Sequence, residues 1–236
     1  MQPAQPQHLK LLVTIVDRGK GQLAVDLLLE QKVVYHRIML GRGTAKTEIL
    51  DLLGIGDPAK DIILSILPES RMASALHRLK KTLQFDNPGH GIAFTLAIGS
   101  VGGQRVLSFL SAHADEETGG KEHHMERHTE KQYDLILAVV NKGFADQVMD
   151  AARPAGAQGG TVMHARGAGM QEAEKFFGIT IQPEKEIVLI LAHHEHKRPI
   201  MEAICHAVGL NTEGRGIVFS LPVEEAVGVA RIMREE

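Results

Sequence analysis

The sequence predicts an α+β protein built from two tandem copies of one strand–helix–strand–strand–helix–strand module. Two observations support this prediction. The second half of the chain repeats the first at a nearly constant spacing, and in each half apolar runs of strand length alternate with segments of helical periodicity. A repeat determines the architecture of the whole chain, so it takes precedence over any local pattern. The two halves are therefore expected to share one fold.

The repeat keeps one offset over its first part and changes by one residue further along the chain. At an offset of 124 residues, the matching pairs of segments are 16–19 with 140–143, 41–43 with 165–167, and 53–55 with 177–179. At an offset of 125 residues, they are 58–62 with 183–187 and 89–94 with 214–219. Two registers that differ by one inserted residue indicate a duplication.

Short apolar runs predict four strands in each copy. They are 9–16, 33–40, 62–67 and 92–98 in the first copy, and 135–140, 160–164, 187–192 and 217–221 in the second. Runs of this length bounded by turn residues are typical of strands. The third run of each copy is apolar throughout, which is typical of a central strand.

Helical patterns separate these strands in a fixed order. The first helices are predicted over 21–31 and 145–152, and the second are marked by apolar residues on one helical face: Met72, Leu76, Leu79 and Leu83, then Ile200, Ile204 and Val208. This order predicts a ferredoxin-like βαββαβ module, which is a four-stranded antiparallel sheet with both helices on one face. The modules are expected over 1–111 and 133–236. They are joined by a polar linker, 112–132, that is rich in His and Glu.

Composition excludes several classes of protein. The chain has 236 residues, 44% of them hydrophobic, and a net charge of -3, so no excess of positive charge favours nucleic acid. No run of 18 apolar residues predicts a membrane span, and the polar start of the chain does not resemble a signal peptide. The single cysteine, Cys205, is expected to be a small buried side chain of a helix, and a cytoplasmic location is expected.

Three repeated features resemble the PII nitrogen-regulatory (PII-like signal transduction) family, whose subunit is this same module. An excursion of about 20 residues separates the second and third strands (41–60 and 165–185), where that family has its T-loop. A lysine ends each excursion. A Gly-x-Gly turn, the family's B-loop, precedes the last strand, and a Phe follows three residues later. Members of the family are regulatory proteins and not enzymes. They bind ATP or ADP between modules, often with 2-oxoglutarate, and signal to a partner protein.

The resemblance implies a set of ligand-binding residues. Lys60 and Lys185 match the lysine at the end of the T-loop, and the turn glycines Gly89, Gly91, Gly214 and Gly216 match those that cradle phosphate. Arg42, Arg166 and Arg215 are further basic candidates. Arg42 and Arg166 recur at one place in both copies, where they are equally suited to grip an anion and to pair with a neighbouring carboxylate. ATP, ADP or AMP is the implied ligand.

The sequence also departs from the family pattern. Ile92 and Ile217 stand where the family has a lysine after the turn, and Gly103 and Gly228 stand near the family's pair of arginines. The excursions contain no tyrosine, so regulation by tyrosine modification is not expected. Key phosphate-binding charges of the family are therefore missing, and the identity of the ligand stays open.

Each excursion contains a segment that predicts a short amphipathic helix closed by glycine, over 48–54 and 172–178. Their apolar residues are Leu52, Leu53, Phe176 and Phe177. One interpretation is that these side chains pack back on the module. The other is that they form a docking surface for a partner protein.

Histidine clusters supply the alternative function, a metal-binding protein of ferredoxin-like fold. One cluster lies in the linker (His123, His124, His128), and the other follows the third strand of the second copy (His193, His194, His196). Solvated surface histidines explain both clusters equally simply. No nucleophile or acid–base constellation predicts an enzyme. We therefore expect a PII-like sensor of a small anionic metabolite. It would control a membrane transporter or a metabolic enzyme, and it would form a homo-oligomer, with a trimer favoured.

Overall fold

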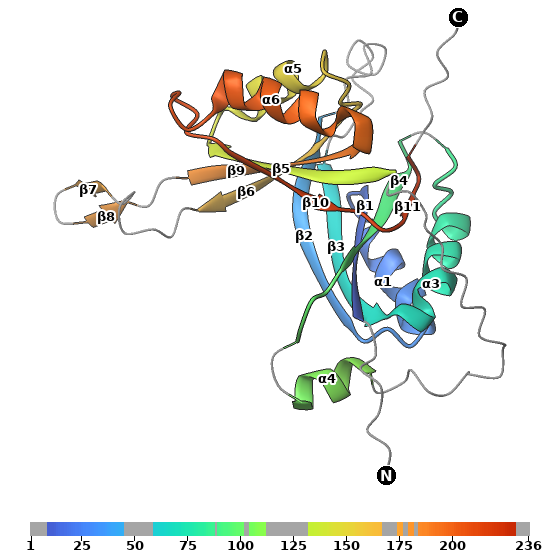
Figure 1. The fold of residues 1–236 in the computed structure, drawn as a ribbon. Coiled ribbons are helices and arrows are strands. Elements are labelled where there is room, and N and C mark those ends of the chain that lie inside the picture. Colours follow the sequence, from blue (N-terminus) through green and yellow to red (C-terminus); the bar gives the residue numbers. More distant parts are fainter. Residues whose placement is uncertain are drawn as a thin grey trace, which may run out of the picture. The chain divides into compact units, whose positions relative to one another are not determined.

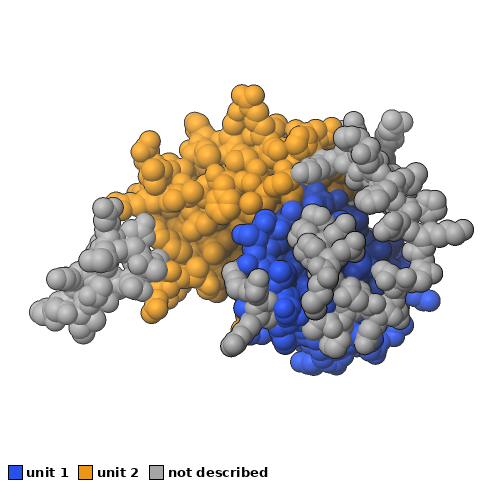
Figure 2. Space-filling view, turned by 60° about the horizontal axis from the view of Figure 1, so that its bottom comes forward, with its two compact units in different colours: residues 1–39, 61–131, 223–236 blue, residues 40–60, 132–222 orange. Residues whose placement is uncertain are grey.

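The computed structural model describes residues 9–44, 59–87, 89–101, 104–111, 132–166, 174–176, 179–181 and 184–229. Two compact units divide the chain, and they are coloured separately in Figure 2. Unit 1 comprises residues 1–39, 61–131 and 223–236, and unit 2 comprises residues 40–60 and 132–222. Each unit therefore includes a segment from the other half of the sequence.

Unit 1 contains the strands and helices of the first copy (Figure 1). They are β1 (Leu9–Asp17), α1 (Gly21–Glu30), β2 (Tyr35–Gly43), β3 (Ala59–Pro68), α3 (Glu69–Thr82), β4 (Gly91–Ala97) and α4 (Gln104–Ser111). Strand β11 (Ala226–Val227) joins them from the far end of the chain. The strand order is β2-β3-β1-β4-β11, and the last residues of β2 and the first of β3 are counted with unit 2.

Unit 2 repeats this sequence of elements. They are β5 (Tyr133–Asn141), α5 (Ala145–Ala152), β6 (Thr161–Arg166), β9 (Glu184–His193), a 3₁₀ turn (His194–His196), α6 (Lys197–Val208) and β10 (Ile217–Pro222). The strand order β10-β5-β9-β6 is the order of a ferredoxin-like sheet, as is β4-β1-β3-β2 in unit 1. The predicted α+β class, with an antiparallel sheet, is confirmed.

The strand registers show the repeat residue by residue. Thr95 of β4 lies opposite Leu12 of β1, and Ser220 of β10 lies opposite Ile136 of β5. These pairs are related by the two sequence offsets, since Leu12 corresponds to Ile136 at 124 residues and Thr95 to Ser220 at 125. The extra residue of the second copy is therefore absorbed before the last strand.

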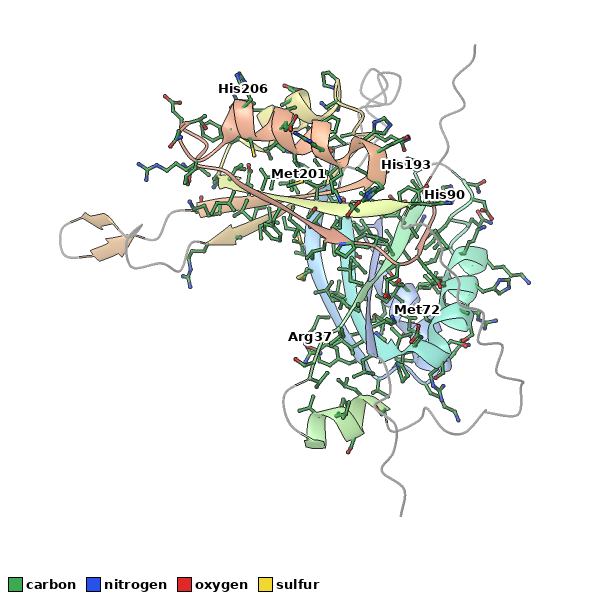
Figure 3. All side chains as sticks on the ribbon, viewed as in Figure 1. Arg37, Met72, His90, His193, Met201 and His206 are labelled. Carbon is green, nitrogen blue, oxygen red and sulfur yellow. The ribbon has the colours of Figure 1, made fainter. Side chains whose placement is uncertain are left out.

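The two helices of each unit cover one face of its sheet (Figure 1). In unit 1, residues of α1 and α3 share one core with β1, β3 and β4, and Met72 lies on the inner side of α3 (Figure 3). In unit 2, α5 and α6 contribute Val148, Met149, Ile200 and Ile204 to a core with β5, β6 and β9. Each such side chain stabilises the fold by about 1.5–3 kcal/mol when fully buried.

Two predictions of local structure are wrong. Residues 174–176 do not form a helix. They form β7 (Glu174–Phe176), which pairs antiparallel with β8 (Ile179–Ile181), and the β-branched residues of β8 favour a strand. Cys205 is exposed and not buried, because it lies one residue further round α6 from the buried Ile204. Helix α4 and strand β11 were not predicted at all.

Within the described ranges, no helix is both long enough and apolar enough to cross a membrane.

Candidate ligand-binding site

A buried carboxylate at the start of the third strand caps the first helix in both copies. Asp61 Oδ2 accepts hydrogen bonds from the backbone N–H groups of Gly19 (2.8 Å) and Gly21 (3.1 Å). Glu186 Oε2 accepts them from Gly143 (3.1 Å) and Ala145 (3.0 Å). Both residues are only 6% exposed. A carboxylate is favourable here because it satisfies N–H groups that have no partner within the helix.

This carboxylate directly follows the predicted ligand-binding lysine in each copy. Lys60 and Lys185 are each the second residue of their strand and are half-buried, and Asp61 and Glu186 come next. Arg18 also contacts the buried group in unit 1, with its Nε 2.8 Å from Asp61 Oδ1. The end of each excursion is therefore attached to the N-terminus of a helix through its third-strand residues.

In unit 2, Asn141 joins Lys185 to the glycine turn. Lys185 Nζ donates to Asn141 Oδ1 over 3.0 Å, and Asn141 Nδ2 donates to the backbone oxygen of Glu213 over 2.8 Å. The backbone N–H of Asn141 donates to the oxygen of Gly214 over 2.9 Å. Two of the predicted ligand-binding segments, the end of the excursion and the turn, therefore meet through a side chain that sequence analysis did not single out.

A surface ion pair lies beside this junction. Lys142 Nζ donates to Glu184 Oε2, which lowers the pKa of the Glu184 carboxyl and raises the pKa of Lys142. The two side chains are both more than half exposed, so their pairing contributes little to stability. Its consequence is local, because it keeps a negative charge directly before Lys185.

The glycines of the unit 2 turn allow close packing against the end of α6. A Cβ atom on Gly216 would lie 2.3 Å from the oxygen of Val208, and one on Gly214 would lie 3.0 Å from the Val208 Cβ. The N–H of Gly216 donates to that same oxygen over 2.7 Å, and the N–H of Arg215 donates to Thr212. These two N–H groups are therefore already used within the turn, while the Arg215 side chain is exposed.

The corresponding turn of unit 1 is tight for a similar reason. Gly91 has a φ of 143°, and a Cβ atom there would lie 2.7 Å from the oxygen of Ile15. Gly89 has a φ of 83°, a conformation that glycine adopts without cost. His90, between them, donates its backbone N–H to Asn87 over 3.3 Å.

Arg42 and Arg166 occupy equivalent strand ends in different surroundings. Arg42 Nη2 lies 3.3 Å from Asp146 Oδ1, in the first turn of α5. Arg166 ends β6, where its backbone lies opposite Glu184 of β9. Both arginine side chains are exposed. The pairing of Arg42 with a carboxylate is the structural alternative expected for it.

The start of the first excursion is attached within unit 2, a feature that the sequence did not indicate. Thr44 Oγ1 donates to the oxygen of Gly160 (3.0 Å) and accepts from the N–H of Gly160 (2.8 Å). Arg153 Nη2 donates to the backbone oxygen of Thr44 over 2.7 Å. Arg42 and Gly43 also pair with Val162 and Thr161 of β6. The root of this excursion is thereby held by both side-chain and backbone hydrogen bonds.

The histidines after β9 have separate partners. His194 Nδ1 lies 2.6 Å from Asp134 Oδ2, a buried carboxylate that also accepts from Lys197 Nζ over 3.2 Å. His193 stacks on Tyr133, with ring centroids 4.5 Å apart, and its position is labelled in Figure 3. His196 Nε2 lies 3.5 Å from Glu195 Oε1. In the part of the chain that the structure describes, no three or more His, Cys, Asp or Glu residues are grouped to hold a metal ion.

The predicted partner-docking residues fall mostly outside the described residues. Leu52, Leu53 and Phe177 lie outside them, and Phe176 is described only as part of the backbone of β7. The linker histidines His123, His124 and His128 also lie outside.

Comparison with known proteins identifies a family over the second half of the chain. The model of the family described as nitrogen regulatory protein P-II matches residues 133–233. Comparison with curated protein sequences gave no match.

Solved structures that are similar to this chain include three PII proteins. PII of Arabidopsis thaliana bound to citrate is 23% identical, with 44% of this chain and 84% of that chain covered and a TM-score of 0.31. The apo form of CPII from Thiomonas intermedia K12, a nitrogen regulatory PII-like protein, is 23% identical, with coverage of 39% and 89% and a TM-score of 0.31. The B. subtilis GlnK–ATP complex is 13% identical, with coverage of 42% and 96% and a TM-score of 0.33.

The family assignment rests on the sequence match, which covers the strands and helices of unit 2 and the glycine turn that contains Gly214 and Gly216. The chain therefore carries a member of the nitrogen regulatory P-II family in residues 133–233.

Proposed function

We propose that this protein is a PII-like regulator that senses a small anionic metabolite and controls a partner protein through its two excursions. The family match over residues 133–233 supports a regulatory role and not an enzymatic one. The contact of Lys185 with Asn141, and of Asn141 with the glycine turn, is the observation that carries the proposal for the ligand. An ammonium group held by a neutral amide remains available as a charge partner for an anion.

Ligand binding would act on the excursion through this junction. An anion that draws Lys185 Nζ away from Asn141 Oδ1 replaces a neutral hydrogen bond by a charge-assisted one. The start of β9 and the turn at Gly214 would then no longer be joined through Asn141. A ligand can shift the excursion only by its difference in affinity for the two arrangements. This junction provides such a difference.

The basic residues around the two turns define the ligand class. Arg42, Lys60, Arg166, Lys185 and Arg215 are the proposed charge partners, with the turn glycines Gly89, Gly91, Gly214 and Gly216 beside them. An adenine nucleotide, with or without 2-oxoglutarate, is the ligand we propose. For Arg42, binding requires release from Asp146, a pair that is exposed and therefore weak.

The family also guides the proposed organisation. We propose PII-like modules over 1–111 and 133–236 with a linker over 112–132, acting in the cytoplasm as a homo-oligomer, for which a trimer is favoured. The proposed target is a membrane transporter or metabolic enzyme, contacted through Leu52, Leu53, Phe176 and Phe177 of the excursions.

Calorimetric titration of the metal-free full chain tests the ligand proposal. ATP, ADP, AMP and 2-oxoglutarate are titrated singly and in pairs, and zinc is titrated separately. We expect saturable binding of a nucleotide. Lys185→Met and Lys60→Met should each weaken it by roughly tenfold or more, which corresponds to the loss of one charge-assisted contact of about 1.5–3 kcal/mol. Lys81→Met is the matched control, since Lys81 is an exposed lysine of α3 that contacts neither turn.

An Asn141→Leu variant separates ligand contact from coupling. It removes the amide that joins Lys185 to the turn and leaves the ammonium in place. We expect retained nucleotide binding and an altered response of the excursion, read as a loss of ligand-dependent protease protection. Silence toward every nucleotide and 2-oxoglutarate in the wild type would contradict the proposal, and stoichiometric zinc binding in that case would bring the metal-binding alternative forward.

A further inference from the structure

The outer edges of the last strands differ between the two units. In unit 1, β4 is followed in the sheet by β11, with Ala226 opposite Phe94 and Val227 opposite Ala93. In unit 2, the equivalent strand β10 is the terminal strand of the sheet, and among the described residues no strand pairs with its outer edge. An open edge strand presents unpaired N–H and C=O groups that can pair with another chain.

Equivalent apolar residues on these two strands differ in exposure. Phe94 of β4 is fully buried, at 0% exposure, whereas Phe219 of β10 is 42% exposed. Its neighbours on the same side of β10, Ile217 and Leu221, are 58% and 39% exposed. Alternate residues of a strand share one face, so the three form a continuous apolar stripe. Val218, which points the other way, packs against the core of unit 2.

The chemistry that binds the added strand in unit 1 is also present in unit 2. Thr95 donates its N–H to the oxygen of Glu225 (2.9 Å) and accepts from the N–H of Glu224 at its own oxygen (3.0 Å). Its hydroxyl accepts from the N–H of Glu225 over 3.1 Å. Ser220 corresponds to Thr95 in strand register, and it provides the same backbone groups and a hydroxyl. The open edge of β10 is therefore equipped for the contact that β4 already makes.

The charges next to each edge indicate which segment fits. In unit 1, Lys10 Nζ lies 2.8 Å from Glu224 Oε2, at the start of the added segment. Burial alone would lower the pKa of Lys10, but Glu224 and Glu69 beside it hold that pKa above its usual value. In unit 2, the residue equivalent to Lys10 is the buried carboxylate Asp134. A segment carrying Glu224 would meet a like charge there, so the C-terminal segment does not suit β10.

The segment after β4 lacks that charge. At the repeat offset of 125 residues, Glu224 corresponds to Gly99 and Glu225 to Ser100. Both residues are exposed, and Val101 follows them at the position of Ala226. This neutral segment is the sequence equivalent of the strand that covers β4. Within its own chain it continues beyond β4, where Ile98 donates its N–H to the oxygen of Leu9, and it does not pair with β10.

We propose that a second copy of this chain docks on the open edge of β10 and adds its residues 99–101 there as a strand. Ser100 of the incoming copy would lie beside Ser220, as Glu225 lies beside Thr95 in unit 1. Such an interface is heterologous, because the edge of one copy meets a different segment of the next. The proposal concerns assembly, and it holds whether or not the protein binds a nucleotide.

Light scattering on the ligand-free full chain tests the assembly. The wild type should show a concentration-dependent mass above the 25.7 kDa of one chain. Ser220→Pro removes the outward N–H while proline is tolerated on an edge strand, and it should return the mass to that of one chain. Phe219→Lys should raise the dissociation constant roughly tenfold or more, because it places a charge in the apolar stripe. Leu210→Lys, at an exposed apolar residue of the turn after α6, is the control and should not change it.

Cross-linking identifies the segment that occupies the edge. In a Cys205→Ser background, chains with Ser100→Cys are mixed with chains with Ser220→Cys and treated with a short bis-maleimide. We expect covalent dimers from this mixture and none when Glu225→Cys replaces Ser100→Cys. A single-chain mass at every concentration, or an oligomer unchanged by both β10 variants, would overturn the proposal. Cross-linking to Glu225→Cys would overturn the choice of segment. Circular dichroism spectra and melting curves verify that each variant is folded.

Discussion

Arg153 donates a hydrogen bond from Nη2 to the backbone oxygen of Thr44 over 2.7 Å, and both residues belong to unit 2. This contact attaches the root of the first excursion to the residue that follows α5. Thr44 is only 7% exposed, and its hydroxyl exchanges two hydrogen bonds with the backbone of Gly160. The position at which an excursion leaves the fold is thus rigidly defined, although nothing in the local sequence marks Thr44 as special.

The Thr44 hydroxyl is predicted to stabilise unit 2. Thr44→Val keeps the shape of the side chain but leaves the N–H of Gly160 without its partner. We expect the free energy of unfolding to fall by about 1–3 kcal/mol, which is the usual cost of an unsatisfied buried donor. Chemical denaturation measures the change, with Ser74→Ala, at an exposed serine of α3, as the control. An unchanged denaturation midpoint for Thr44→Val would show that water replaces the hydroxyl.

The two buried carboxylates are predicted to act independently in the two units. Asp61→Leu and Glu186→Leu each leave two backbone N–H groups without an acceptor. We expect each to cost about 2–4 kcal/mol, and Asp61→Asn to cost less because an amide oxygen still accepts. Hydrogen exchange should show loss of protection at the start of α1 for the Asp61 variants and at the start of α5 for Glu186→Leu. Equal loss at both helices in both variants would contradict independence.

His36 is predicted to make stability depend on pH. Its Nε2 lies 2.8 Å from the oxygen of Val33, so this nitrogen carries the hydrogen, and Nδ1 accepts from Ser65 Oγ over 2.9 Å. Burial lowers the pKa of His36 below its usual value of 6.5, and the hydrogen bond to Val33 only partly offsets this effect. The unfolded chain therefore binds the proton more readily than the folded chain.

The sign of the pH effect follows from that difference. The contribution of His36 to stability is complete above pH 6.5 and is lost as the pH falls below it. Denaturation curves at several pH values between 7.5 and 5 should show this loss in the wild type and a smaller one in His36→Gln. If both proteins lose stability equally, other groups determine the acid dependence. Ser65→Ala serves as a control, since it removes the hydroxyl partner and keeps the titrating ring.

Gly228 is predicted to be essential for the attachment of β11 to β4. It has a φ of 80°, and a Cβ atom there would lie 2.3 Å from the oxygen of Gly91. Gly228→Ala adds both strain and a collision with backbone that cannot yield easily. We expect the N–H groups of Thr95 and Val227 to lose protection from hydrogen exchange. Gly228→Asn tests the cause, because asparagine tolerates positive φ but still carries the Cβ atom. A protected β11 in Gly228→Asn would attribute the effect to strain alone.

The sequence by itself determined the repeated architecture. Apolar runs and helical faces predicted both sets of strands and first helices to within a few residues, because side-chain periodicity reflects which face is buried. It also located Lys60 and Lys185 at the starts of third strands. It was wrong where periodicity is short: residues 172–178 have too few turns to separate a helix from the β7–β8 hairpin, and Cys205 lies at the border of the buried face of α6.

Only the tertiary structure decided which long-range partners the key residues find. Asp61 and Glu186 read as ordinary charges at strand starts, and Asn141 and Thr44 as ordinary polar residues. Their roles depend on backbone groups about 40 to more than 100 residues away. The same holds for β11, whose two residues carry no strand signal and pair with β4 because its edge is open. Local sequence encodes burial and propensity, whereas a hydrogen bond between distant segments depends on where the packed cores place their ends.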